Sequence, residues 1–154
     1  MIIFGIDPGV TGAIVAIHTS GDVIGSTMMP VIRSKKGYRI DCPSIKDFIS
    51  ECLSVSKDCH AVLEKVHSMP GQGVSSTFNF GKYYGNVEAV FQTLDIPMSY
   101  VTPQTWKKKF GFLGMTKDEP RLLLKESFPK WKELDVKYKG QALADAYYIA
   151  KYIL

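Results

Sequence analysis

The stretch MIIFGIDPGVTG (residues 1–12) decides how the rest of the chain is interpreted. Its apolar run at residues 2–7 is too short for a membrane span or for the apolar region of a signal peptide. We interpret it as a buried strand whose carboxyl end presents Asp7. The glycines that follow allow a tight turn and a close backbone approach to a phosphate or a metal ion. By itself, the D-x-G-x-x-G pattern is a weak signal for such a site, because an aspartate that only caps a turn would also explain it.

Apolar periodicity along the rest of the chain predicts an α/β protein. The expected strands are residues 2–7, 13–18, 23–29, 61–66 and 96–101. The expected helices open at Pro43-Ser44 and then cover residues 77–94, 103–110, 117–128 and 141–153. This order predicts a mixed five-stranded sheet, three antiparallel strands and then two parallel ones, flanked by helices. With no repeat or linker to divide the chain, we expect one domain spanning residues 1–154.

The formal net charge of +4 comes from one segment. Residues 101–139 hold 10 Lys or Arg against 5 Asp or Glu, whereas residues 1–100 hold 8 against 9. Such an excess fits a surface that faces a polyanion, and it fits a solvated, lysine-rich helix face equally well. Three cysteines without a C-x-x-C pair argue against a disulfide framework and a thiolate zinc site. Without a secretion signal or membrane span, we expect a cytoplasmic protein, near the nucleoid or in a host cytoplasm.

Glu64 interrupts the apolar strand predicted at residues 61–66. A charge inside a strand is costly unless it is paired or coordinates an ion. Alternation could place Glu64 on a solvated face together with Val62, as a plain surface residue. A central strand covered by helices has little solvated face, however, so the position favours a functional carboxylate.

Asp145 lies in the stretch ALADAY (residues 142–147), which we assign to the opening turns of the last helix. The helix dipole favours an anion near a helix N-terminus, and this alone could explain an aspartate there. The flanking alanines would also let the helix approach the sheet closely, so that Asp145 could meet Asp7 and Glu64. Three converging carboxylates are hard oxygen ligands that suit Mg²⁺ or Mn²⁺.

These acids stand within an ordered set of motifs that resembles the RuvC family of Holliday junction resolvases. The motifs are FGIDPGVTG (4–12), LEKV (63–66), GQGVSSTFNFG (71–81), VTPQTWKK (101–108) and ADA (144–146). The block at residues 71–81 is the most specific of them. The resemblance spans essentially the whole chain and is closest to compact, phage-type members.

The resemblance implies an RNase H-like fold and a homodimer that makes paired nicks in a four-way junction. It implies two Mg²⁺ ions per active site, which Mn²⁺ should replace, held by Asp7, Glu64 and Asp145. Relatives usually carry a fourth ligand, Asp or His, three or four residues before the last acid; here Ala142 and Gln141 stand there. Gln141 offers only a neutral oxygen. Because clustered carboxylates repel one another until a cation binds, we expect cleavage to need the metal and to slow at acidic pH.

DNA would be held by a loop and helix start beside the acids and by the basic segment. Glycines permit a close approach to backbone, hydroxyls and amides donate to phosphates, and rings stack on bases. In the loop and helix start, the predicted contacts are Gly71, Gln72, Gly73, Ser75, Ser76, Thr77, Phe78, Phe80 and Lys82. In the basic segment they are Lys107, Lys108, Lys109, Lys117 and Arg121. The two phenylalanines could instead be core or dimer-interface residues, and we expect at least one of them to be buried.

Three alternatives remain open on the sequence. A kinase-like ATPase also uses a strand ending in Asp followed by glycines, but it needs two such domains around a nucleotide, so we expect no nucleotide cofactor. A nuclease of the same fold could act on forks, flaps, other branched DNA or RNA–DNA hybrids, since fold does not fix the substrate. A junction-binding protein with weakened catalysis would fit the missing fourth acid.

Overall fold

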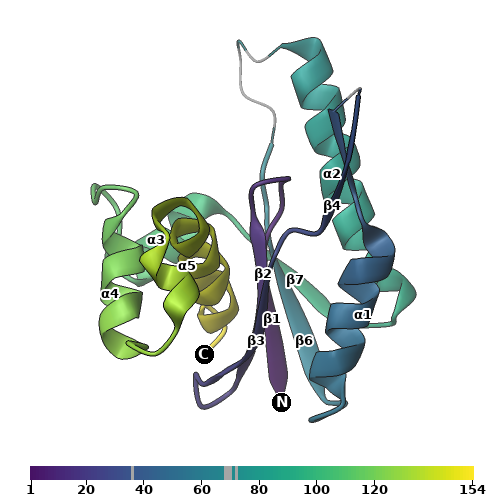
Figure 1. Cartoon of the computed structure of the whole chain (residues 1–154). Coiled ribbons are helices and arrows are strands. Elements are labelled where there is room, and N and C mark those ends of the chain that lie inside the picture. Colours follow the sequence, from purple (N-terminus) through teal and green to yellow (C-terminus); the bar gives the residue numbers. More distant parts are fainter. Residues whose placement is uncertain (36, 68–70, 72) are drawn as a thin grey trace.

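The computed structural model describes residues 1–35, 37–67, 71 and 73–154, and its centre is a five-stranded mixed sheet (Figure 1). The strands are β1 (Ile2–Asp7), β2 (Ala13–His18), β3 (Val23–Met28), β6 (Cys59–Glu64) and β7 (Met98–Val101). Their order across the sheet is β3-β2-β1-β6-β7. β1 pairs antiparallel with β2 and parallel with β6, and β7 adds parallel to β6. The predicted mixed α/β sheet is therefore confirmed.

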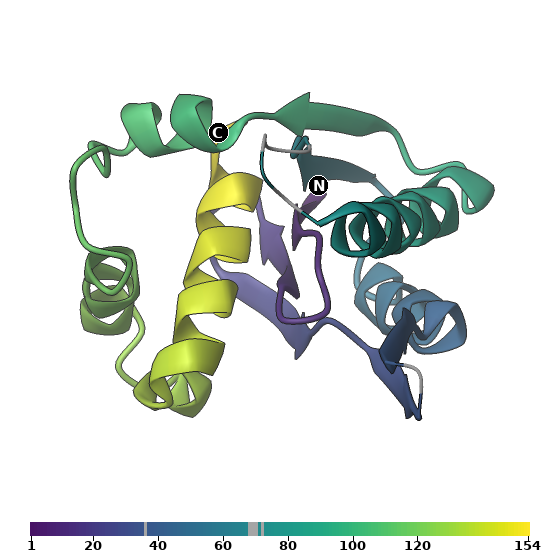
Figure 2. The same cartoon turned by 90° about the horizontal axis from the view of Figure 1, so that it is seen from above.

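Helices cover both faces of this sheet (Figures 1 and 2). One face packs against α1 (Cys42–Leu53) and α2 (Val74–Thr93). The other packs against α3 (Pro103–Lys109), α4 (Glu119–Ser127), the 3₁₀ turn Lys132–Asp135 and α5 (Lys137–Lys151). Such double coverage explains why β1 is a nearly continuous apolar run instead of an alternating one.

The two faces of β1 contact different helices. Ile2, Phe4 and Ile6 belong to the core beneath α1 and α2, whereas Ile3 belongs to the core beneath α5. Because successive side chains point to opposite faces, Asp7 shares the α5 side with Ile3. The strand therefore directs its terminal acid toward the last helix.

Gly5 is the residue of β1 that lets α5 come close to the sheet. A Cβ atom at this position would collide with the carbonyl oxygen of Ala146 and the amide nitrogen of Ala150. The buried small residues Ala142, Ala144 and Ala146 contribute to the same close packing. The expectation that alanines bring this helix against the sheet agrees with the packing found.

Several predicted boundaries differ from the structure; β7, for example, begins at Met98 instead of residue 96. The strand predicted at 61–66 is β6, residues 59–64, so Glu64 ends it instead of interrupting it. α2 begins at Val74 instead of residue 77. α5 begins at Lys137 instead of residue 141, because the stretch KYKG (137–140) is also helical. This stretch lacks an apolar pattern, and its Gly140 lies against Arg121.

A second sheet was not predicted at all. It is the two-stranded hairpin of β4 (Val31–Ser34) and β5 (Gly37–Ile40), which lies beside α2 (Figure 1). Its short strands are mostly exposed and do not alternate cleanly between apolar and polar residues, so they leave little periodic signal.

Other predictions concern local chemistry. Thr102 caps α3 by accepting a hydrogen bond from the Thr105 amide at 3.3 Å, and Pro103 is the first helical residue, as expected. Cys42, Cys52 and Cys59 are free thiols. Within the described residues, none of the helices combines the length and the apolar character that crossing a bilayer requires.

Candidate active site

Asp7 and Glu64 end neighbouring parallel strands at the same edge of the sheet. The register pairs Ile6 of β1 with Leu63 of β6, so the next residue of each strand is an acid. Glu64 shares a face with Val62, which is fully buried in the core beneath α5. The face that alternation assigns to Glu64 is therefore covered by helices, which excludes the interpretation of Glu64 as a plain surface residue.

Asp145 reaches the same edge from α5, but not from the start of that helix. Because α5 begins at Lys137, Asp145 lies in its third turn, and the prediction that it sits in the opening turns was wrong. The helix dipole, which acts within the first turn, does not stabilise its charge. Close packing of α5 on Gly5 brings Asp145 to the acids instead.

The three acids lie close enough to affect one another's ionisation. Burial, followed by the charges of Glu64 and Asp145, raises the pKa of Asp7 to about 7. Burial raises the pKa of Asp145 to about 6, and the charge of Glu64 adds to this rise. Burial also raises the pKa of Glu64. These shifts have the sign expected of carboxylates that share a partly desolvated pocket.

Two lysines oppose this repulsion. The positive charges of Lys107 and Lys117 lower the pKa of both Asp7 and Asp145 and so favour their ionised forms. Both lysines, together with Asp145, line a cavity of about 310 Å³ that the loop at residues 112–116 completes. An anionic group that enters this cavity would meet the two ammonium groups next to the acids. The two lysines are thus the predicted phosphate contacts that lie beside the candidate site.

Trp106 is a site residue that sequence reasoning missed. Its indole Nε1–H donates a hydrogen bond to Glu64 Oε1 at 2.8 Å, and this bond lowers the pKa of that carboxyl. The Trp106 side chain is fully buried, so it holds one glutamate oxygen in a fixed place. The Lys107 ammonium lies over the same ring, 5.2 Å from its centroid. The sequence carried one signal for this contact. Trp106 lies in the helix that begins after the Thr102 cap, and a tryptophan that this helix buries needs a hydrogen-bond acceptor for its indole N–H.

The carboxylates do not form a ready-made ligand cage. Within the described part of the chain, no three His, Cys, Asp or Glu side chains are arranged to hold a metal ion. The donor chemistry nevertheless fits a divalent cation, because a cation would offset the burial that raises the three pKa values and the repulsion that adds to the rise at Asp7 and Asp145. Asp7, Glu64 and Asp145 are thus the residues that could hold metal after side-chain rotation.

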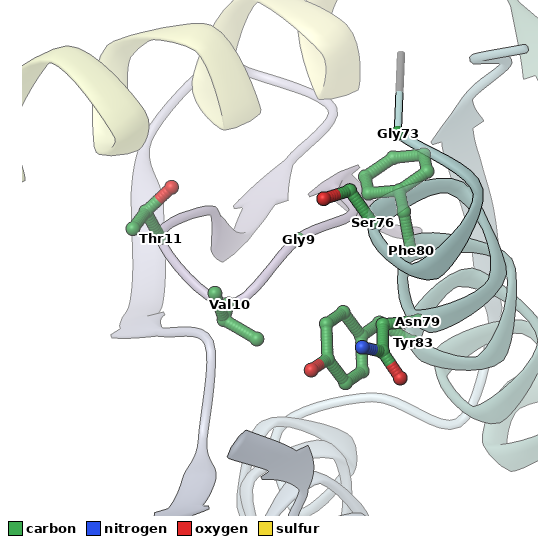
Figure 3. Close-up of a pocket in the computed structure, with 8 residues that line it drawn as sticks. All are labelled: Gly9, Val10, Thr11, Gly73, Ser76, Asn79, Phe80 and Tyr83. Carbon is green, nitrogen blue, oxygen red and sulfur yellow. The ribbon is translucent and has the colours of Figure 1, made fainter. Parts of the chain in front are cut away.

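A larger cavity of about 570 Å³ opens between the β1–β2 turn and α2 (Figure 3). Its lining residues are Gly9, Val10, Thr11, Gly73, Ser76, Asn79, Phe80 and Tyr83. The turn directly follows Asp7 in the chain, although none of the three acids lines this cavity. It offers hydroxyl, amide and aromatic groups in one place, as a nucleic-acid groove does.

The rings and hydroxyls predicted to contact DNA are open to solvent. Phe78 is 68% exposed, and Phe80 is half-buried against the cavity, so the expectation that at least one of the two is buried was wrong. Neither ring is needed to fill the core, and both are available for contacts. Among the other predicted contacts, Gly71, Gly73, Ser75 and Ser76 are exposed and Thr77 is half-buried. Gln72 lies outside the described residues.

The predicted lysines differ in their contacts. Lys82 is exposed and lies over the Phe78 ring, 5.8 Å from its centroid. Lys108 is exposed on α3. Lys109 donates a hydrogen bond to the Tyr152 carbonyl oxygen at 2.6 Å and therefore ties α3 to the C-terminal turn. Lys109 has a structural role in addition to any contact with DNA.

Arg121 is not placed to contact phosphate. Its side chain is buried, and its guanidinium donates to both carboxylate oxygens of Asp118, at 2.7 and 2.8 Å, and to the Leu134 carbonyl oxygen at 2.6 Å. The Arg121 hydrogen bonds lower the pKa of Asp118 to about 2. The prediction was wrong because the sequence shows the positive charge of Arg121 but does not show that the fold pairs it with Asp118.

Gln141, which was predicted as a possible metal ligand, instead contacts the Arg121–Asp118 pair. Its amide nitrogen donates to Asp118 Oδ1 at 3.0 Å. The side chain is thus engaged by the residue that precedes α4, one turn of α5 before Asp145. This arrangement gives no support to Gln141 as the replacement for a fourth acid.

Comparison with known proteins gives a match in structure and none in sequence. No protein-family model matches the chain, and no curated protein matches it either. A Thermus thermophilus RuvC structure in complex with a Holliday junction substrate superposes with a TM-score of 0.57 at 16% identity, covering 99% of this chain and 92% of that one. The chain has the RuvC fold. A second Thermus thermophilus RuvC structure superposes with a TM-score of 0.52 at 18% identity, covering 96% and 92%.

The match confirms the predicted fold class across nearly the whole chain. RuvC and this chain share the five-stranded mixed sheet with flanking helices that places Asp7, Glu64 and Asp145 at one edge. At this level of identity the likeness concerns the fold, and the chemistry must be argued from the residues of this chain.

Proposed function

We propose that the protein is a structure-selective DNA endonuclease that resolves four-way junctions by metal-dependent phosphodiester hydrolysis. The observation that carries the proposal is the meeting of Asp7, Glu64 and Asp145 at one sheet edge, beside Lys107 and Lys117. A site with acids for a cation and ammonium groups for a phosphate is suited to phosphodiesters. The shared fold with a RuvC that was solved on a Holliday junction supports branched DNA as the substrate.

Each residue of the site has a role in this proposal. Asp7, Glu64 and Asp145 would hold Mg²⁺, or Mn²⁺ in its place, with two ions per active site. Bound metal supplies an activated water and charge stabilisation at the leaving oxygen. Trp106 keeps the Glu64 carboxylate oriented through its 2.8 Å hydrogen bond. Lys107 and Lys117 attract the scissile phosphate and keep the acids ionised before the cation arrives.

We further propose that the protein acts as a homodimer. Two opposed strands of a four-way junction are related by a two-fold axis, so a symmetric pair of active sites matches them. The start of α2 leaves two apolar side chains in solvent, Val74 at 86% exposed and Phe78 at 68%. A partner subunit or DNA would cover them. Sedimentation velocity of the free protein tests the dimer.

A junction-binding protein with weakened catalysis is the second candidate. It is favoured by Ala142 and Gln141 in place of a fourth acidic ligand, with Gln141 engaged by Asp118. Weak binding of one of the two metal ions would slow cleavage but leave binding to the junction intact. Cleavage only at high Mn²⁺ concentration, with tight binding to the junction throughout, would identify this case.

The proposal is tested by a panel of labelled substrates with and without Mn²⁺. The panel contains a mobile four-way junction, a fork, a flap, an RNA–DNA hybrid and plain duplex. We expect paired nicks in the junction, none in excess chelator, and none with Glu64→Gln, which should still bind the junction. Cutting in chelator, or cutting by the glutamine variant, would overturn the metal-dependent mechanism. Faster cutting of the fork, flap or hybrid would reassign the substrate.

A further inference from the structure

The β4–β5 hairpin carries a concentration of positive charge that the site does not use. Residues 23–40 contain Arg33, Lys35, Lys36 and Arg39 and no Asp or Glu. They supply four of the eight basic residues found in the first hundred positions. The net charge of residues 1–100 does not reveal this cluster, because the nine Asp and Glu residues of that segment offset its eight basic residues.

The hairpin presents three of these charges to solvent. Arg33, Lys35 and Arg39 are all exposed, and none of them forms an ion pair with a described residue. Lys36, next to Lys35 in sequence, lies outside the described residues. The strand register sets Arg33 opposite Tyr38, whose ring is 44% exposed. Basic side chains interleaved with an exposed aromatic ring are typical of nucleic-acid surfaces.

The base of the hairpin is fixed to the rest of the molecule. Ile40 is buried at 4% exposure, and the preceding Met29 is buried at 3%. The Tyr83 hydroxyl of α2 donates a hydrogen bond to the Tyr38 carbonyl oxygen at 3.0 Å. An isolated two-stranded hairpin is marginally stable in water, so these anchors are what hold it beside α2.

The hairpin is also continuous with the candidate site. Tyr83 lines the 570 Å³ cavity that begins at the turn after Asp7. From the turn that follows Asp7, a surface therefore runs along this cavity and over Tyr83 of α2 to the hairpin. Figure 1 shows the hairpin beside α2, toward the end of the molecule where β1 and β6 end, and Figure 2 shows it on the side of the sheet that carries α1 and α2, away from α5.

We propose that the β4–β5 hairpin is a second DNA-contact surface, which binds the phosphate backbone of a duplex arm that leaves the branch point. Arg33, Lys35 and Arg39 contact phosphates, and the crossover itself lies at the acids. The inference rests on the proposed function, because it assigns to this hairpin one arm of the same branched substrate. Phosphate contacts carry no base specificity, so the hairpin strengthens binding without selecting sequence.

The first test is the salt dependence of binding by the triple variant Arg33→Ala/Lys35→Ala/Arg39→Ala. Affinity for a long-armed four-way junction is measured by fluorescence anisotropy over a series of salt concentrations. Each phosphate contact adds about 0.9 to the slope of log affinity against log salt, so three lost contacts should lower it by roughly 2–3 and weaken binding at least about tenfold at low salt. The matched control is Lys57→Ala/Lys130→Ala/Lys132→Ala, three exposed lysines that lie outside the hairpin and are not among the predicted DNA contacts, which should lower the slope far less.

The second test shortens the junction arms. If the hairpin holds an arm, the triple variant and the wild type should bind a short-armed junction equally well. A slope unchanged by the triple substitution would overturn the inference. So would a loss that persists on short arms together with a shift toward monomer in sedimentation, because the hairpin would then belong to a subunit interface. Wild-type protein that binds plain duplex as tightly as junctions would contradict the proposed function, while a triple-variant loss on that duplex would still support the hairpin contact.

Discussion

Glu64 occupies an unusual position for an ionisable residue, at the end of a buried strand and under a buried tryptophan. Its carboxylate is raised in pKa by burial, yet the Trp106 hydrogen bond and the Lys107 charge both act to keep it ionised. A hydrogen bond to a charged group contributes about 1.5–3 kcal/mol. Trp106 is therefore a positioning residue whose removal should alter both the geometry and the ionisation of Glu64.

Trp106→Phe removes the indole donor and keeps an aromatic ring in the core. We expect the pKa of Glu64 to rise, so the acidic limb of the pH–rate profile moves to higher pH and cutting at neutral pH falls about tenfold or more. Single-turnover nicking across pH measures both effects. Trp131→Phe, at a half-buried tryptophan beside Phe128, is the matched control and should leave the profile in place. A uniform loss of rate without a shift of the profile would mean that Trp106 acts only in packing.

The lysines of α3 are expected to contribute unequally. Lys107 lies beside the acids, whereas Lys109 is bonded to the Tyr152 carbonyl oxygen. Lys107→Ala should lower the salt slope of junction binding by about one unit and also slow cutting, because a phosphate contact is lost. Lys109→Ala should mainly lower the melting temperature. Equal effects of the two substitutions on the salt slope would contradict this division.

At the scale of elements, the site depends on how closely α5 packs on β1. Gly5 permits this approach, since a Cβ there would collide with the backbone of α5. Moving α5 away would separate Asp145 from Asp7 and Glu64. The arrangement of the three acids is in this sense determined by a residue with no functional group.

Gly5→Ala should therefore cost both stability and activity. Overpacking a well-packed core costs about 1–3 kcal/mol, and a collision with main chain belongs at the upper end of that range. Chemical denaturation and the nicking assay measure the two effects. Gly85→Ala is the control, because its Cβ would meet nothing within 4 Å and alanine favours the helix by about 0.5–1 kcal/mol. A Gly5→Ala protein with unchanged stability and cutting would contradict the role given to this contact.

The elements that the sequence predicted are those with a strong periodic pattern. Residues 2–7 and 13–18 are apolar runs between turn residues, and both are strands. The hairpin at 31–40 was missed because its strands are short, exposed and stabilised from outside by Tyr83. The start of α5 was missed because the stretch at 137–140 lacks an apolar pattern and contains a glycine, which is acceptable only because Arg121 and Leu134 pack against it.

At the scale of the whole molecule, the sequence predicted which acids come together at one edge of the sheet but not how they are supported. Asp7, Glu64 and Asp145 stand out because each is an acid within an apolar context. The Trp106 bond to Glu64 spans 42 positions, and the Arg121 bond to Leu134 spans 13, so only the folded chain reveals them. For the same reason, the charge count included Arg121, which is paired with Asp118, and overlooked Arg33, Lys35 and Arg39, which form no ion pair with a described residue.

The stability of the whole protein should fall as pH rises in the absence of divalent metal. The pKa values of Asp7 and Asp145 are raised from 3.8 to about 7 and about 6, so the folded state binds more protons than the unfolded state between about pH 4 and 7. Folding is thus favoured at the acidic end of this window, and the gain is lost as pH passes through the folded values. A pKa difference of one between the two states corresponds to about 1.4 kcal/mol.

Thermal melting in chelator at pH 5 and pH 8 tests this. The melting temperature should be higher at pH 5, by about 2–4 °C for each kcal/mol that the two carboxyls contribute, and Mg²⁺ should raise it at pH 8 more than at pH 5. Asp7→Asn should flatten the difference between the two pH values and weaken the Mg²⁺ effect. Greater stability at pH 8 in chelator would contradict the picture of three carboxylates held together against their repulsion.

The central claim is that Asp7, Glu64 and Asp145 together form one site for divalent cations. Calorimetric titration of the free protein with Mn²⁺ at pH 7.5 tests it without relying on cleavage. We expect saturable binding that Asp7→Asn, Glu64→Gln and Asp145→Asn each weaken at least about tenfold, because each removes one carboxylate ligand. Asp22→Asn, at an exposed acid in the β2–β3 turn, should bind like the wild type. Wild-type affinity in any one of the three site variants would remove that residue from the metal site and contradict the claim.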